Sequence, residues 1–96
     1  MKLVRDNIPN IMRSKGLVPV VRVAKDEELE SLLMAKLDEE LKEIKEGKNP
    51  EEVADLIEVA FALGELFGKS EEQINELRKN KNNKNGSFKK KIVLED

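Results

Sequence analysis

The stretch KLDEELKEIKEGKNPEEVADLIEVAFALGEL, residues 36–66, holds two helical patterns on either side of a short turn. A glycine can end the first helix, Asn49 can cap the second, and Pro50 suits a first helical position, where no backbone N–H is needed. We expect the helices over residues 27–46 and 51–67. Because helices joined by so few residues pack antiparallel, the sequence predicts a helical hairpin.

The flanking sequence adds shorter elements to this hairpin. A short helix is expected after Asp6, and a third helix after Ser70, followed by the polar loop NNKNG, residues 82–86. Residues 17–23 are rich in β-branched side chains, and residues 88–95 contain a second apolar run. We expect these two segments to pair as a small two-stranded β element. The predicted fold class is therefore mainly α.

The composition excludes several kinds of site. A chain of 96 residues provides one domain, residues 1–96, and a core that is aliphatic because only 3% of the residues are aromatic. With no cysteine and no histidine, thiolate metal sites, cysteine nucleophiles and histidine bases are excluded. Any metal would be held by oxygen, which favours a hard cation such as Mg²⁺ or Mn²⁺. No signal-peptide pattern and no membrane-length apolar run is visible, so a cytoplasmic protein is expected.

The charges are divided along the chain. Seventeen acidic and five basic residues lie from Asp26 to Glu76, whereas three acidic and thirteen basic residues lie outside that window. An acidic middle is thus flanked by two basic ends. Alternating solvated surface would produce this pattern, and so would a central cation site that receives anion-binding groups from the ends.

Some of the acidic side chains are expected to point inward. With Leu29 set at zero and about 100° per residue, the apolar arc of the first helix runs from about 300° to about 120°. Glu40 at about 20° and Glu43 at about 320° fall inside that arc, while Glu39 at about 280° lies at its edge. Lys36, at about 340°, stands between Glu40 and Glu43.

The second helix repeats the arrangement. With Glu51 set at zero, Glu52 falls at about 100° and Asp55 at about 40°, on the side of Val59 and Leu63. Each helix therefore brings an acidic pair to the shared face. Unpaired carboxylates buried together repel one another and lose hydration, and a divalent cation would offset both costs. Alternatively, Lys36 and nearby bases neutralise the cluster, or the helix angles drift enough to expose it.

Four segments resemble one protein family. EELKE at residues 39–43 and EVAD at residues 52–55 are similar to the paired acidic motifs of the all-α nucleoside triphosphate pyrophosphohydrolases, the MazG-like and phosphoribosyl-ATP pyrophosphohydrolase-like group. KLVRDNIP at residues 2–9 and GSFKKKIVLE at residues 86–95 resemble one small branch of that group. The chain departs from the family in its short inter-motif segment and in its scarcity of aromatic residues for stacking on a base.

The resemblance implies a Mg²⁺-dependent hydrolase. Family members cleave between the α- and β-phosphates and release pyrophosphate with a nucleoside monophosphate or a phosphoribosyl-AMP-like product, an activity suited to nucleotide-pool house-cleaning. Carried over residue by residue, the metal ligands are Glu40, Glu43, Glu52 and Asp55. With no histidine available, Glu43 or else Glu39 would activate the water. Lys36, Arg5, Lys84 and Lys89 are the candidate phosphate-binding residues.

The second helix also predicts self-association. It is apolar on nearly every side, and one neighbouring helix covers only part of its circumference. A homodimer in which two hairpins form a four-helix bundle would cover the remainder, and a tetramer would do so as well. Two other readings stay open: a non-catalytic interaction module with a basic C-terminal segment, and a degenerate enzyme that binds nucleotide without cleaving it. Specific nucleic-acid binding is not expected, because the lysines lack interleaved aromatic residues.

Overall fold

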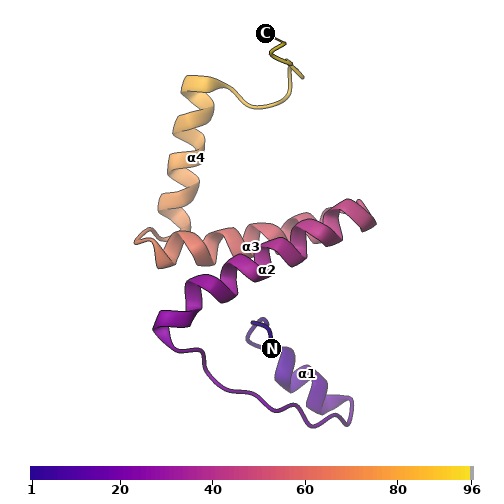
Figure 1. Cartoon of the computed structure of the whole chain (residues 1–96). Helices are drawn as coiled ribbons and strands as arrows, with labels where there is room; N and C mark the ends of the chain where they lie inside the picture. The colour runs from indigo at the N-terminus through magenta and orange to yellow at the C-terminus, as the bar shows by residue number, and fades with distance from the viewer. Residues whose placement is uncertain (96) are drawn as a thin grey trace.

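The computed structural model describes residues 1–95, which form four helices (Figure 1). These are α1 (Ile8–Ser14), α2 (Asp26–Gly47), α3 (Pro50–Leu66) and α4 (Glu71–Asn85). The mainly α class is confirmed.

The expected β element is wrong: over residues 1–95 the structure has no strand. Residues 17–23 run from α1 towards α2, whereas residues 88–95 extend from the far end of α4, on the other side of the hairpin (Figure 1). Most of their apolar side chains are exposed, including Val20 at 100% and Leu94 at 89%. An isolated two-stranded ribbon is at best marginally stable in water. Residues 17–23 and 88–95 lie apart from each other and do not pack on a core, so they do not form one.

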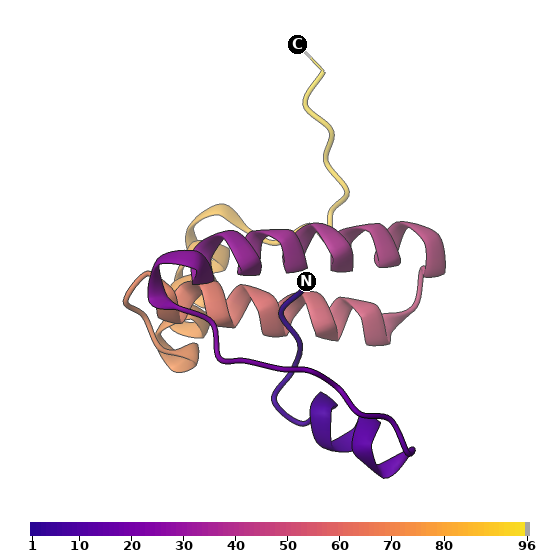
Figure 2. The same cartoon turned by 60° about the horizontal axis from the view of Figure 1, so that its bottom comes forward.

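The hairpin turn follows the sequence signals closely. Lys48 adopts a left-handed backbone, φ 54°, and ends α2, while Asn49 caps α3 by accepting a hydrogen bond from the backbone N–H of Glu52 at 3.2 Å. Pro50 occupies the first position of α3. The two helices then lie antiparallel, side by side, along most of their length (Figure 2).

The core is small and aliphatic. Its buried apolar residues are Leu33 of α2 with Val59 and Leu63 of α3. Partly buried residues pack against these three: Leu3, Leu29, Leu37 and Ala62. Leu3 reaches them because the N-terminal segment crosses one face of the hairpin (Figure 2). Other apolar side chains of α3, such as Val53 and Ile57, remain more than 40% exposed.

Helix α4 leaves the end of α3 at a steep angle (Figure 1). Ser70 caps it by accepting from the N–H of Gln73, whose side chain in turn accepts from the N–H of Ser70. The helix extends to Asn85, so the loop expected at residues 82–86 is mostly helical. Ile74 packs closely over Gly64 of α3, and among the helices α4 contacts α3 alone.

Within residues 1–95, no helix combines the length and the apolar character that a membrane span requires.

Candidate metal and phosphate site

Glu40 is the one buried charged residue among those the structure describes, with 5% of its surface exposed. Its Oε1 lies 3.6 Å from the Nζ of Lys36, whereas its Oε2 is buried and has no hydrogen-bond partner. Burial raises the pKa of this carboxyl, the nearby carboxylates of Glu43 and Asp55 raise it further, and Lys36 opposes them. The inward direction predicted for Glu40 is therefore confirmed.

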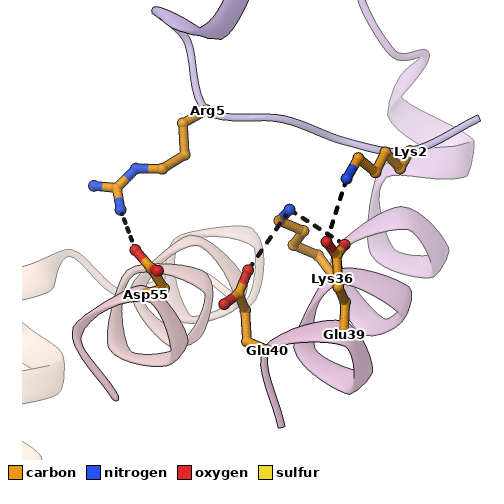
Figure 3. A network of polar contacts seen from close by, with 6 residues as sticks. All are labelled: Lys2, Arg5, Lys36, Glu39, Glu40 and Asp55. Atoms are coloured by element: carbon orange, nitrogen blue, oxygen red, sulfur yellow. Dashed lines mark hydrogen bonds and ion pairs between the residues drawn. The ribbon is translucent and has the colours of Figure 1, made fainter. Parts of the chain in front are cut away.

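Asp55 faces the same region from α3 and already has a basic partner. Its Oδ1 accepts a hydrogen bond of 2.9 Å from Arg5, which the N-terminal segment carries across the hairpin (Figure 3). The side chains of this pair are 58% and 41% exposed, so solvent weakens their attraction. Arg5 and Asp55, fifty positions apart in sequence, thus meet at the edge of the acidic face.

Glu52 lies nearer the turn of the hairpin. Its Oε1 accepts from the side-chain amide of Asn49 at 3.4 Å, and its Oε2 is buried without a partner. The carboxylate sits over Gly47, where an added Cβ would come within 2.6 Å of both oxygens. Glycine at this position therefore makes room for the Glu52 side chain.

A second ion-pair group surrounds Glu39 (Figure 3). Glu39 accepts from Lys2 at 3.3 Å and from Lys36 at 3.2 Å. Burial opposes ionisation of this carboxyl, but the two lysines outweigh that effect and lower its pKa. Lys36, with 16% of its side chain exposed, therefore bridges Glu39 and Glu40.

The structure brings together some of the expected site residues and separates others. Glu39, Glu40, Asp55, Lys36 and Arg5 form one region (Figure 3), and Glu43 lies close enough to Glu40 to perturb its pKa. Glu52 lies nearer the turn of the hairpin, and the two other basic residues predicted for the site lie apart from this region. Lys84 is in the last turn of α4 and Lys89 is in the segment after it, and both elements lie away from the side of the hairpin that carries α1 (Figure 1).

Sequence reasoning missed one member of the site, Lys2. It belongs to the matched segment at residues 2–9, but a terminal lysine carries no local signal of its partner. Its contact with Glu39 exists only because the N-terminal segment folds back over α2. Lys2, Lys36 and Arg5 together supply the neutralising bases that the sequence had left as an alternative to a cation.

The carboxylate oxygens of the site are the kind of ligand that a hard cation prefers, but they do not converge on one point. Across residues 1–95, no three acidic side chains converge in a geometry that would ligate a metal. Two buried carboxylate oxygens nevertheless lack any partner, one on Glu40 and one on Glu52, and they lie on the two facing helices. Unpartnered anionic oxygens of this kind are what a hard cation would satisfy. As placed here the carboxylates do not form a complete ligand set, and Asp55 would have to exchange Arg5 for a cation to join one.

Comparison with known proteins adds one relative. No protein-family model matches the chain, and no solved structure matches it. The chain is similar to an uncharacterised protein of Mycolicibacterium smegmatis, with 48% identity over 55 residues that make up 57% of this chain. It spans less than half of that relative, because the matched segment covers 44% of the relative's length. The relative's name states no activity, and function is therefore inferred from the side chains described above.

Proposed function

We propose that this protein is a cytoplasmic, Mg²⁺-dependent nucleotide pyrophosphohydrolase that cleaves between the α- and β-phosphates of a nucleoside triphosphate. The observation that carries the proposal is the buried Glu40 carboxylate, one oxygen of which has no partner. An anion is seldom held in such a place without compensation. The family resemblance of the motifs around Glu40 and Asp55 supports the same conclusion.

Four carboxylates would hold the cation: Glu40 and Glu43 from α2, and Glu52 and Asp55 from α3. Facing helices position them; Glu40 is buried and the other three are partly buried. The cation supplies positive charge that polarises the phosphate oxygens. The unpartnered oxygens of Glu40 and Glu52 are available to it without breaking any hydrogen bond of their own.

Basic residues at the rim would bind the substrate phosphates. Arg5 would be free to bind a phosphate if Asp55 held the cation, and its planar guanidinium suits a phosphate. Lys36 lies beside Glu40 and reaches the same region. Lys2 keeps its contact with Glu39 or joins the phosphate group.

The hydrolytic step needs a base for water. Its oxygen adds to phosphorus, the bridging P–O bond breaks to release pyrophosphate, and a proton passes to a carboxylate. Glu43 is the better candidate for this role. Two lysines stabilise the charged form of Glu39, and this lowers its pKa and makes it the poorer proton acceptor.

Asp55→Asn tests the proposal. An amide keeps the shape of the side chain but loses the charge that a hard cation requires. Mg²⁺-dependent pyrophosphate release should therefore fall more than tenfold, since loss of even an outer-shell partner of a metal ligand costs about 10–100-fold. Pyrophosphate is measured across a panel of nucleoside triphosphates, with and without Mg²⁺. Glu58→Gln is the matched control, an exposed carboxylate one turn further along α3, and should retain activity. Full activity in Asp55→Asn would overturn the metal assignment.

We also propose that the active form is a homodimer or tetramer. Helix α3 leaves Val53 and Ile57 43% and 46% exposed, and Phe67, just after the helix, is 61% exposed. Packing of two hairpins as a four-helix bundle would remove this apolar surface from water. A monomer mass at micromolar concentration in light scattering would contradict the assembly.

A non-catalytic interaction module is the second candidate. It is favoured by the neutralisation of the acidic face by Lys2, Lys36 and Arg5 in the absence of any ligand. Pyrophosphate release that is absent for every nucleotide, together with a melting temperature indifferent to Mg²⁺, would select this reading.

A further inference from the structure

A groove of about 860 Å³ runs between the N-terminal segment with α1 and the hairpin. Its apolar lining includes Leu3, Ile11 and Leu66. The basic residues of the lining, Arg5 and Lys36, are already bound to carboxylates outside it. The remaining charges of the lining are therefore negative.

Three exposed acids supply that negative charge: Asp6 beside α1, and Glu58 and Glu65 on α3. None of them forms an ion pair with any residue in the range 1–95. The groove thus combines an apolar floor with uncompensated acidic groups, which suits an extended peptide that is both basic and apolar.

The segment after α4, residues 86–95 or the tail, has that character. Lys89, Lys90 and Lys91 precede Ile92, Val93 and Leu94, and these apolar side chains are between 77% and 89% exposed. Phe88, just before the lysines, is 98% exposed. Four large apolar side chains exposed to water on the two sides of a basic run, one before it and three after it, have no partner within residues 1–95 and are typical of a docking segment.

The tail cannot enter the groove of its own chain. Helix α4 carries it about 22 Å away from α3, given 15 residues at about 1.5 Å each. From Gly86 to Val93 the chain reaches at most about 25 Å, which is little more than the return along α4 to the near side of the hairpin. Helix α1, which lines the groove, lies on the opposite side of the hairpin from the tail in both views (Figures 1 and 2).

We propose that the tail of a second copy of this chain occupies the groove, with its lysines against Glu58 and Glu65 and its apolar residues over Leu66. Exchange between two copies fills both grooves and buries both tails. It also brings Lys89 of the second copy to the side of the hairpin that carries Arg5 and Lys36. The docking is tested by cross-linking and not by measuring turnover, so its test does not depend on the proposed catalytic function.

The absence of native cysteine allows a direct test on the full chain. Leu66→Cys places a thiol in the groove and Val93→Cys places one in the tail. The two variants, distinguished by a size tag, are mixed, oxidised mildly and separated on a non-reducing gel. Val53→Cys, on α3 outside the groove and similarly exposed, replaces Leu66→Cys in the matched control. Circular dichroism checks that each variant keeps its helices.

We expect the Leu66→Cys and Val93→Cys pair to give at least fivefold more mixed dimer than the control pair. Reversing the charge of Lys89, Lys90 and Lys91 to glutamate should reduce that yield severalfold, and adding Glu58→Lys with Glu65→Lys should restore it. Equal yields in the two pairs, no cross-link, or an internal disulfide in a monomeric double variant would each overturn the proposal. Binding of the tail to anionic vesicles while the groove stays uncross-linked would overturn it as well.

Discussion

Replacing Glu40 with glutamine should stabilise the metal-free protein. The wild-type carboxylate is almost fully buried, and its Oε2 has no partner. Leaving a buried acceptor unsatisfied costs about 1–3 kcal/mol, and more when the acceptor is charged. The substitution removes this charge and its repulsion with Glu43 and Asp55.

The substitution also loses the contact with Lys36 at 3.6 Å, and this loss sets the limit on the gain. Removing one partner of a buried ion pair costs about 3–5 kcal/mol when the other charge is left uncompensated. The charge of Lys36 remains compensated, because Lys36 keeps its 3.2 Å contact with Glu39. We therefore expect a net gain of about 1 kcal/mol, which in a chain of this size raises the melting temperature by about 4–8 °C.

Thermal unfolding followed by circular dichroism at pH 7, without divalent cations, measures the effect. Glu39→Gln is the control, since it removes a carboxylate paired with both Lys2 and Lys36 and should be neutral or destabilising. A lower melting temperature for Glu40→Gln than for wild type would refute the reasoning.

The pH dependence of this effect has a defined sign. Because the pKa of Glu40 is raised in the folded state, the wild type loses stability as the pH rises from the ordinary value of 4.5 through the raised pKa. The advantage of Glu40→Gln should therefore grow over that range and level off above it.

Millimolar Mg²⁺ should raise the melting temperature of the wild type but not of Asp55→Asn, because a ligand bound only by the folded state stabilises it; an equal shift in both would remove Asp55 from the metal site. Gly64→Ala should destabilise the packing of α4, since the added Cβ would lie 2.7 Å from Ile74; overpacking costs about 1–3 kcal/mol against about 1 kcal/mol gained in helix propensity. In a protein that already carries Ile74→Ala this contact is absent, so Gly64→Ala should there raise the free energy of unfolding measured by urea titration. Arg22 lowers the pKa of Glu28 to about 2 through hydrogen bonds, so the stability from this pair is present above pH 4.5 and is lost as the pH falls towards 2. Glu28→Gln should flatten the acid limb of the stability curve relative to wild type.

The hairpin could be predicted because its determinants are local. Asn49 and Pro50 define the start of α3, and the 3.6-residue period places Glu40 among the leucines without knowledge of any distant contact. The β element failed for the opposite reason. Extended β-branched sequence becomes a strand only beside a partner, and the two segments lie on opposite sides of the hairpin.

The ion pairs of the site could not be predicted from the sequence either, because they too depend on contacts between distant segments. The contact of Arg5 with Asp55 and that of Lys2 with Glu39 depend on the path of the N-terminal segment across the helices. The continuation of α4 through Asn82 to Asn85 also went unpredicted, since asparagine is a poor helix former. No packing contact in the structure accounts for that extension.

The connection between α1 and α2, residues 15–25, has a consequence for how the two bases are delivered. It contains neither helix nor strand, so α1 and the segment before it are joined to the hairpin through a tether. A flexible tether of that length keeps the N-terminal segment within about 20 Å of the hairpin, which gives the segment an effective concentration in the millimolar range. At a millimolar effective concentration, an exposed ion pair such as that of Arg5 with Asp55, worth about 1 kcal/mol at most, would not hold the segment in place by itself, so the packing of Leu3 against the core must contribute as well. Doubling the tether costs only about 0.6 kcal/mol of closure entropy, so insertions there should be tolerated. A single proteolytic cut in the same segment would release Lys2 and Arg5 together and leave the acidic face without two of its three bases.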